Sequence, residues 1–260
     1  MNCLLTGGTG IVGSHIIFDW IHKAIVEKTV NHLFVIIRDN NKSAQQRLLD
    51  ILKDPSRPNF LNKFTLDECL EKITVISSDL ANINKNTLSK YNFNTVIHCA
   101  GSTNLQNTTD SKEKVHSQNY LVTKNLLNEL PKTVKRFIYI STAYSFGIKN
   151  TVVDDNTKNH ASLSYRNPYE KSKFDSEQYV KKVCTLKNID AQILRPSIIC
   201  GRLLDVPFYE TPKYDVFYSW AIFLDKYANS AKDKFRIWID KKSGLNIVPV
   251  DFVSKIILHC

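Results

Sequence analysis

The 260-residue sequence predicts an α/β fold, in which helices cover the faces of a doubly wound parallel sheet. Three observations lead to this prediction. Short apolar segments alternate with longer segments of helical periodicity along most of the chain. A glycine-rich turn at residues 7–13 joins the first apolar segment to the first helical one. No repeat and no Gly/Ser linker divides the chain, so we expect a single domain over residues 1–260.

The elements follow in order along the chain. We expect strands at 2–7, 32–38, 72–77, 95–100, 136–141 and 190–196, because each is a short run rich in Val, Ile, Leu or Phe. We expect helices at 10–25, 42–53, 111–130 and 168–187, which are longer and amphipathic. Strands that alternate with helices in this way form one parallel sheet with covering helices.

The pattern loosens after about Arg195, where prolines occur at 196, 207 and 212. Here we expect an aromatic helix at 213–229, a short strand at 235–239, and a strand followed by a helix at 246–260. Residues of about 200–245 are expected to form a small C-terminal cap on the substrate side of the sheet. The helix at 213–229 has a broad apolar face, which more often packs in a core than lines a lipid tunnel.

Composition and charge exclude several classes of protein. The chain has 35 Lys and Arg against 25 Asp and Glu, a net charge of +10, which favours anionic partners. The basic residues lie in small groups without a dense basic helix, so we expect no nucleic-acid binding. The simplest interpretation is a solvated basic surface. A sharper one is docking of an acidic carrier protein or of the phosphates of coenzyme A.

Cysteine spacing and hydropathy indicate a protein of a reducing compartment. The six cysteines are widely separated and form no C-x-x-C pair, which is typical of reduced thiols. No apolar run reaches the roughly 18 residues of a membrane span, and the glycine-broken first segment does not resemble a signal peptide. We therefore expect a cytoplasmic protein. The seven histidines form no H-E-x-x-H or Cys/His cluster, so we expect no metal site and a structural role for His98.

The glycine-rich turn predicts a dinucleotide site on a Rossmann-like sheet. Glycines at this strand-to-helix junction let a pyrophosphate approach the backbone N–H groups at the helix N-terminus, where a Cβ would block it. The strand, turn and helix form the context that this motif requires. The predicted cofactor contacts from the turn are Gly7, Thr9, Gly10, Ile11, Val12 and Gly13.

The end of the second strand bears on the choice between the two nicotinamide cofactors. A carboxylate there would bind the adenosine ribose of NAD(H) and repel a 2′-phosphate. Ile37 occupies that position and Arg38 follows, with Arg47 in the next helix as a second phosphate ligand. The sequence therefore favours NADP(H) over NAD(H). If Asp39 turned into the site instead of Arg38, the preference would reverse.

Three Tyr-x-x-x-Lys pairs occur, and two of them lack a suitable context. Tyr120 and Lys124 lie inside a helix with no preceding strand that would place a hydroxyl beside them. Tyr209 and Lys213 flank Pro212, which disfavours a continuous helix between them. The third pair is therefore the candidate catalytic pair.

Tyr169 and Lys173 begin a helix that follows the strand "RFIYIST". Residues four apart on a helix lie side by side. A free tyrosine has a pKa near 10, and the adjacent ammonium together with an oxidised nicotinamide favours the phenolate. Thr142, just past the strand, supplies a second donor to a carbonyl oxygen that becomes negative as a hydride arrives. These residues point to carbonyl reduction or oxidation.

The sequence resembles the extended short-chain dehydrogenase/reductase superfamily over nearly its whole length. The resemblance rests on "TGGTGIVG" and "YEKSK", and further on "SSDL" at 77–80, "HCAGSTN" at 98–104, "QNYLVTKNLL" at 118–127, "LRPSIICG" at 194–201 and "VPVDFV" at 248–253. Within the superfamily, "VIIRDNNKSAQQRLLDIL", "ISTAYSFG" and "NIVPVDFV" are most similar to the fatty acyl-CoA reductase and carrier-protein thioester reductase branch, also called the male-sterility type.

The resemblance implies further site residues. The implied cofactor contacts are Asp79 and Leu80 beside the adenine, Ala100, Gly101 and Ser102 along the cleft, and Pro196, Ser197, Ile198 and Ile199 against the nicotinamide. The implied catalytic set is Tyr169 as proton donor, Thr142 on the oxyanion, Lys173 on the nicotinamide ribose, and Asn119 as anchor of a water in a proton relay. Hydride transfer from NADPH to an acyl thioester would then give an aldehyde or alcohol and a free thiol.

Other functions of the same superfamily stay open at this point. A nucleotide-sugar epimerase or dehydratase, or a ketone or aldehyde reductase, would share the fold. A non-catalytic dinucleotide sensor is a third alternative, disfavoured by the intact Tyr169, Lys173 and Thr142. Members of the branch carry a further C-terminal region, whereas this chain ends within the helix after "VPVDFV", so we expect a minimal cap or a shortened chain.

Overall fold

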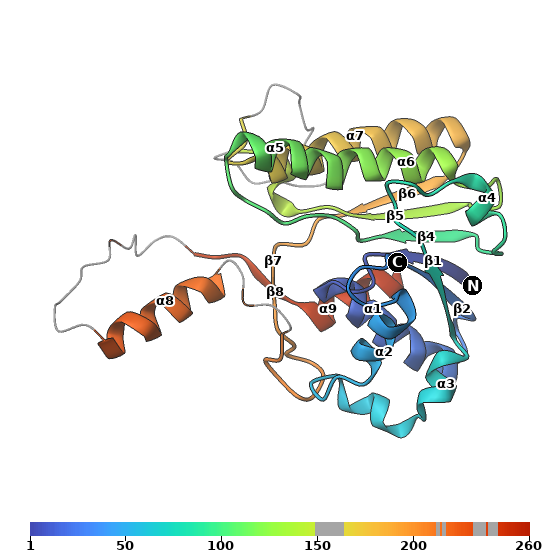
Figure 1. The fold of residues 1–260 in the computed structure, drawn as a ribbon, viewed down its shortest axis with the longest axis horizontal. Helices are drawn as coiled ribbons and strands as arrows, with labels where there is room; N and C mark the ends of the chain where they lie inside the picture. The colour runs from blue at the N-terminus through green and yellow to red at the C-terminus, as the bar shows by residue number, and fades with distance from the viewer. Residues whose placement is uncertain (149–163, 212–213, 215–216, 231–237, 239–243) are drawn as a thin grey trace.

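The main sheet of the computed structural model is parallel and has the strand order β3-β2-β1-β4-β5-β6 (Figure 1). The structure describes residues 1–148, 164–211, 214, 217–230, 238 and 244–260. The strands of the sheet are β1 (Asn2–Thr6), β2 (His32–Ile37), β3 (Ile73–Ser77), β4 (Thr95–His98), β5 (Arg136–Ile140) and β6 (Asp190–Leu194). The predicted fold class is confirmed, and each strand lies within its predicted segment.

The order of the strands determines where a ligand binds. The chain begins at β1, builds outward to β3, then returns to the other side of β1 to form β4, β5 and β6. In such sheets ligands bind beyond the carboxyl ends of the strands, at the point where the strand order reverses. Here that point lies between β1 and β4, whose residues Leu5 and Ile97 are paired in the ladder.

Helices cover both faces of the sheet (Figure 1). They are α1 (Ile11–His22), α2 (Ala44–Leu52), α3 (Leu66–Leu70), α4 (Lys85–Leu88), α5 (Thr109–His116), α6 (Val122–Glu129), α7 (Pro168–Lys187), α8 (Phe217–Ser230) and α9 (Val250–His259). One buried cluster joins the sheet to α1, α2 and α9 through Trp20, Leu48 and Ile257. A second joins it to α6 and α7 through Leu126 and Val180. The strands are apolar on both sides because both faces are covered.

The predicted helix at 111–130 is one helical stretch interrupted by a π-turn. Ser117–Leu121 form this turn between α5 and α6, and a second π-turn at Lys23–Glu27 extends α1. Short 3-10 turns occur at Asn59–Lys63 and Ala143–Phe146. The small elements α3 and α4 were not predicted, because four or five residues carry too little periodicity.

The C-terminal part forms a small parallel sheet of β7 (Ile198–Cys200) and β8 (Ile247–Pro249), together with α8. The expectation that the apolar face of the helix at 213–229 packs in the core is wrong. Trp220 is 63% exposed and Tyr227 45% exposed, and α8 projects away from the main sheet (Figure 1). The face of the sheet on this side is already filled by α1 and α9. The predicted strand at 235–239 lies outside the described residues apart from Trp238.

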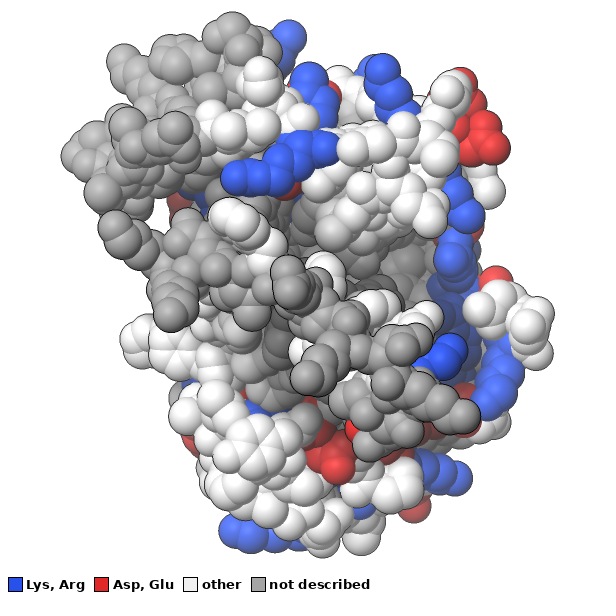
Figure 2. All heavy atoms as spheres, turned by 90° about the vertical axis from the view of Figure 1, so that its left-hand side faces the viewer, with Lys and Arg blue, Asp and Glu red and all other residues white. Residues whose placement is uncertain are grey.

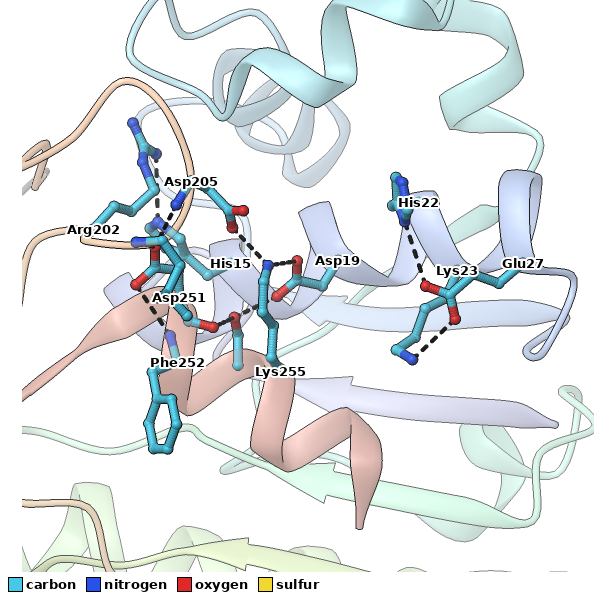
Figure 3. Close-up of polar contacts among 12 residues, drawn as sticks. His15, Asp19, His22, Lys23, Glu27, Arg202, Asp205, Asp251, Phe252 and Lys255 are labelled. Atoms are coloured by element: carbon cyan, nitrogen blue, oxygen red, sulfur yellow. Dashed lines mark hydrogen bonds and ion pairs between the residues drawn. The ribbon is translucent and has the colours of Figure 1, made fainter.

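A buried polar network ties the C-terminal elements to α1 (Figure 3). The carboxylate of Asp251, at the start of α9, accepts hydrogen bonds from the backbone N–H groups of Leu203, Leu204 and Asp205. Burial alone would raise the pKa of Asp251. The hydrogen bonds from these backbone N–H groups have the larger combined effect and hold the pKa below its usual range. The loop after β7 is therefore fixed to α9 by a charged acceptor.

The same network continues to α1 through two further contacts. Lys255 on α9 bridges Asp19 at 2.8 Å and Asp205 at 2.6 Å. Arg202, 2% exposed, donates to Nε2 of His15 at 3.4 Å, while Nδ1 of His15 donates to its own helix. Burial lowers the pKa of His15 to about 4, which leaves it neutral. The loop after β7 and the helix that follows the glycine turn thus form one unit.

Candidate active site

A cleft of about 1060 Å³ opens at the carboxyl ends of the central strands. Its volume lies at the upper end of the range of about 300–1,000 Å³ found for small-molecule sites. Figure 2 shows this end of the molecule, with Lys and Arg side chains along one margin. The lining segments follow four different strands: the turn after β1, the end of β2, residues 78–81 after β3 and residues 99–106 after β4.

The glycine turn forms a backbone cradle at one end of the cleft. Gly7 has φ +74°, a conformation that favours glycine, and the N–H of Gly10 donates to its carbonyl at 2.9 Å. A Cβ on Gly13 would lie 2.1 Å from that same carbonyl oxygen. Gly10 is the N-cap of α1 and has no side chain to cap the first-turn N–H groups. These donors suit a phosphate, so the residues present fit a dinucleotide.

The margin beside β2 carries two arginines. Arg38 and Arg47 both line the cleft. Arg47 donates to the carbonyl of Arg38 at 2.7 Å and to the hydroxyl of Thr9 at 3.1 Å, which orients its guanidinium toward the glycine turn. Asp39 is engaged elsewhere, because its carboxylate accepts from the N–H of Ala44 and the hydroxyl of Ser77, each at 2.6 Å. The carboxylate that would have reversed the cofactor preference is thus directed to the start of α2.

His98 at the end of β4 is a neutral structural residue. Thr123 donates its hydroxyl proton to the carbonyl of Asn119 at 2.6 Å, so it accepts from Nε2 of His98 at 2.9 Å. Nδ1 of His98 then accepts from Thr6 at 2.6 Å, and the Thr6 oxygen accepts from the N–H of Ala100 at 3.2 Å. Burial lowers the pKa of His98 to about 3. This chain of bonds fixes the floor of the cleft, in agreement with the expected structural role.

Asn119 lies on the π-turn between α5 and α6, where an extra residue in the turn often marks a functional position. Its side chain is 1% exposed. It accepts from the N–H of Ser102 at 2.6 Å and donates to the carbonyl of Ser102 at 3.1 Å and to the hydroxyl of Ser172 at 2.8 Å. Asn119 thereby joins the loop after β4 to α7. Its predicted role in a water relay stays a prediction.

Thr142, Tyr169 and Lys173 meet near the carboxyl end of β5. Thr142 caps the 3-10 turn after the strand, and its hydroxyl lies close enough to the Tyr169 phenol to act on the pKa of that phenol. Lys173 is 5% exposed, donates to the carbonyl of Ile140 at 2.6 Å and lies 4.6 Å from the centre of the Tyr139 ring. A Cβ on Gly101 would lie 3.8 Å from the Lys173 Nζ, which places the ammonium beside the cleft-lining loop after β4.

Burial controls the pKa values of this pair. It raises the pKa of the Tyr169 phenol, although the Lys173 ammonium and the Thr142 hydroxyl act to lower it. It lowers the pKa of Lys173, which the Tyr169 charge acts to raise. The expectation that Lys173 favours the phenolate therefore names a real but weaker effect. The buried phenol is held in its protonated form, as a proton donor requires.

The structure brings most of the predicted cofactor residues to the cleft. Those that line it are Gly7, Thr9, Gly10, Arg38, Arg47, Asp79, Leu80, Ala100, Gly101 and Ser102. Gly13 and Val12 are buried behind the cradle, where they shape it. The predicted segment 196–199 is joined to the site by a hydrogen bond from the N–H of Ala143 to the carbonyl of Pro196 at 2.9 Å.

Sequence reasoning missed several lining residues. They are Ile36, Ser78, Ala81, Cys99, Ser117, Gln118 and Val122. Most lie inside the motifs on which the family resemblance rests, at positions to which the sequence analysis gave no role. Residues 103–106 and Ser219 also line the cleft and lie in segments that the sequence places on the substrate side. Burial raises the pKa of the Cys99 thiol to about 12, which keeps this cleft thiol uncharged. Ser219 lies on α8 and brings that helix to the margin of the cleft.

Two negative findings apply to the described part of the chain. Over those residues, no group of three or more His, Cys, Asp or Glu side chains is arranged to hold a metal ion. Among the helices formed by the same residues, none combines the length and apolarity needed to cross a bilayer.

Comparison with known proteins shows which family model and which curated protein this chain matches. A family model described as "Male sterility protein" matches residues 5–257. A putative UDP-glucose 4-epimerase from Methanocaldococcus jannaschii is 27% identical over 208 residues, which cover 78% of this chain and 57% of that protein. The chain thus spans little more than half the length of this curated relative.

Two solved structures share the fold. A thiolation-reductase di-domain from an archaeal non-ribosomal peptide synthetase has a TM-score of 0.73 and 21% identity, covering 99% of this chain and 52% of its own. UDP-glucuronic acid 4-epimerase from Bacillus cereus, solved with UDP-glucuronic acid and NAD, has a TM-score of 0.67 and 19% identity, covering 99% and 72%. One sheet thus serves both reductases and sugar epimerases.

Proposed function

The chain belongs to the male sterility protein family of extended short-chain dehydrogenases/reductases, and we propose that it reduces an acyl thioester with NADPH. The proposed products are an aldehyde, or an alcohol after a second reduction, and a free thiol. The observation that carries the proposal is the grouping of Thr142, Tyr169 and Lys173, with the Lys173 ammonium beside Gly101 of the loop that lines the cleft.

The family binds a nicotinamide dinucleotide, which supplies a hydride to the thioester carbonyl carbon. As the C=O π-bond breaks, its electron pair moves to oxygen, and the Tyr169 phenol gives that oxygen a proton. Thr142 donates a hydrogen bond to the same oxygen while it is negative. Loss of the thiol from the resulting hemithioacetal breaks the C–S bond, returns the hydroxyl proton to sulfur and leaves the aldehyde. Lys173 balances the phenolate that remains on Tyr169.

The protonated phenol supports the direction of reaction. A reductase needs a proton donor at the start of the chemical step, and burial raises the pKa of Tyr169. An oxidation needs the phenolate first, which this burial disfavours. The environment of Tyr169 therefore suits the role of proton donor in a reductive step.

The arginines beside β2 support NADPH over NADH. Arg38 and Arg47 line the cleft on the side where the adenosine ribose is expected. Asp39 is held by Ser77 and the start of α2. Two guanidinium groups with no competing carboxylate from Asp39 favour a ribose that carries a 2′-phosphate.

The acyl group is proposed to arrive on coenzyme A or on a carrier protein. Coenzyme A and a carrier protein both present the thiol at the end of a pantetheine arm that is attached through phosphate. The net charge of +10 attracts either of these anionic carriers. The structural likeness to a thiolation-reductase di-domain favours the carrier-bound form.

A nucleotide-sugar epimerase or dehydratase is the second candidate function. It is favoured by the 27% identity to a putative UDP-glucose 4-epimerase. Such an enzyme oxidises and reduces the same substrate, so it would return its cofactor to the starting state. Net consumption of NADPH therefore distinguishes the two candidates.

The deciding experiment measures the absorbance of reduced nicotinamide with NADPH and three substrate classes. Acyl-CoAs and acyl-carrier thioesters are expected to oxidise NADPH and release a thiol that a disulfide reagent detects. UDP- and dTDP-sugars and simple ketones or aldehydes form the other arms. Oxidation with ketones alone, or sugar conversion without net NADPH loss, would reject thioester reduction.

A further inference from the structure

A buried carboxylate joins α7 and the turn after β5, which carry candidate catalytic groups, to the end of β6. Glu177 is fully buried on α7, one turn after Lys173. Its Oε1 accepts from the hydroxyl of Ser141 at 2.5 Å and from that of Ser145 at 2.7 Å. Arg195, at the end of β6, donates to Oε1 at 2.9 Å and to Oε2 at 2.8 Å. One side chain of α7 thus contacts both the turn after β5 and the end of β6.

Each partner of Glu177 is adjacent to a residue of the candidate site. Ser141 directly precedes Thr142, the proposed oxyanion donor, and Ser145 closes the same turn. Arg195 directly precedes Pro196, the first residue of the segment expected against the nicotinamide. Pro196 in turn accepts from the N–H of Ala143 at 2.9 Å. The position of the Thr142 hydroxyl is thereby coupled to the strand end that is expected against the nicotinamide.

The geometry of the pair makes this coupling stiff. Arginine and carboxylate bond through two parallel N–H···O contacts, which fix relative orientation as well as distance. Phe146, in the turn after β5, packs its ring 4.7 Å from the guanidinium carbon of Arg195. Breaking a buried pair by removing one partner leaves an uncompensated charge, so the arrangement resists alternatives.

We infer that Glu177 is a positioning residue for hydride transfer, which fixes the Thr142 hydroxyl relative to the 195–196 strand end that is expected against the nicotinamide. The inference rests on the proposed function for its reaction, but the placement of the nicotinamide is measurable without a substrate. Glu177 itself touches neither cofactor nor substrate in this role.

Glu177→Gln and Ser141→Ala test the inference in the full chain. In the first variant the new amide presents an N–H toward Arg195 and loses the two-pronged contact, whereas Ser141→Ala removes one hydrogen bond and keeps the ion pair. Because small misplacements of reacting groups cost up to about 100-fold, we expect kcat to fall about 10- to 100-fold for Glu177→Gln and about 3- to 10-fold for Ser141→Ala. KM and the NADPH dissociation constant should stay within about threefold, since the glycine cradle is unchanged.

Two further readouts separate positioning from loss of stability. With NADPH deuterated at the transferred position, the isotope effect on kcat should increase in both variants, because hydride transfer becomes slower than the other steps. The fluorescence of bound NADPH, which reports the surroundings of the nicotinamide, should move toward that of free NADPH. Asp19→Asn is the matched control, because Asp19 is also a buried carboxylate bonded to a serine hydroxyl and a cation, Ser254 and Lys255.

The outcomes are distinct. The inference holds if both variants lose kcat and shift the fluorescence while Asp19→Asn, at a comparable drop in melting temperature, keeps wild-type values. It is overturned if Glu177→Gln keeps kcat within about threefold of wild type, or if Asp19→Asn loses as much. If no thioester oxidises NADPH with the wild-type chain, the proposed function fails, and the fluorescence of the same variants still decides the placement of the nicotinamide.

Discussion

Replacing Arg47 with methionine isolates its part in the choice of cofactor. Methionine keeps the aliphatic packing of the side chain and removes the guanidinium. Two of the guanidinium N–H groups are used within the chain, toward Arg38 and Thr9, and the others remain for a 2′-phosphate. A charge-assisted hydrogen bond contributes about 1.5–3 kcal/mol, and solvent at this half-buried margin reduces it to ~1–2 kcal/mol. We therefore expect NADPH to bind about 5- to 30-fold more weakly.

The assay is a titration of the fluorescence of each reduced cofactor at two salt concentrations. NADH lacks the 2′-phosphate, so Arg47→Met should change its dissociation constant by no more than about threefold, through the lost support of Thr9. The NADPH constant of the wild type should rise more steeply with salt than that of the variant, because screening weakens an exposed charge pair. Arg38→Met provides a second arginine on the same margin. Equal losses for NADPH and NADH in both variants would refute the assignment of the 2′-phosphate to this margin.

Three further variants test the site and the loop after β7. Tyr169→Phe should lower kcat about 10²–10⁴-fold with an unchanged NADPH dissociation constant, as steady-state kinetics and titration would measure, and full activity would contradict its role as proton donor. Gly13→Ala places a Cβ 2.1 Å from the Gly7 carbonyl, so binding of both NADPH and NADH should be lost in the fluorescence titration, and unchanged binding would mean that the cradle is not used. Asp251→Asn should lower the free energy of unfolding in urea by about 2–4 kcal/mol at pH 7. The pKa of Asp251 is lower in the folded than in the unfolded state, so the carboxylate contributes to the free energy of unfolding above about pH 4. This contribution is lost as pH falls through the folded-state pKa, and the difference in unfolding free energy between variant and wild type should narrow there. A difference that stays constant down to about pH 3 would show that the charge of Asp251 is not what stabilises the loop after β7.

Local signals in the sequence were sufficient to predict the strands of the main sheet, helix α7 and the glycine turn. The apolar strands and the helix at Pro168–Lys187 follow from composition and periodicity, and α7 has the predicted bounds. The choice of Tyr169 and Lys173 among three such pairs follows from the strand that precedes their helix, and their proximity follows from helix geometry, since residues four apart share a face. The glycine turn predicts its own cradle because the conformation at Gly7 and the close approach at Gly13 are properties of the local backbone.

The remaining features depend on contacts between distant residues. Whether Asp39 or Arg38 faces the cleft is decided by Ser77, which lies one strand away and removes Asp39 from competition. The contact between Glu177 and Ser141 joins residues 36 positions apart. The exposure of α8 depends on which surfaces α1 and α9 have already covered, a property of the whole fold. Periodicity reports which face of a helix is apolar and leaves open what that face meets.

The same burial acts in opposite directions on the two members of the catalytic pair. It raises the pKa of the Tyr169 phenol and lowers that of the Lys173 ammonium, so each is shifted toward its neutral form, while their mutual attraction opposes both shifts. Lys173 has compensating contacts that favour its charge, the carbonyl of Ile140 and the face of the Tyr139 ring. The Thr142 hydroxyl also lowers the pKa of the Tyr169 phenol, but its effect is smaller than that of Lys173. Before the reaction, the Tyr169 phenol is therefore a proton donor, and the Lys173 ammonium is already in place to stabilise the phenolate that forms on Tyr169. This is the order of events that reduction of a carbonyl requires, since the phenolate forms only after the proton has moved to the substrate oxygen.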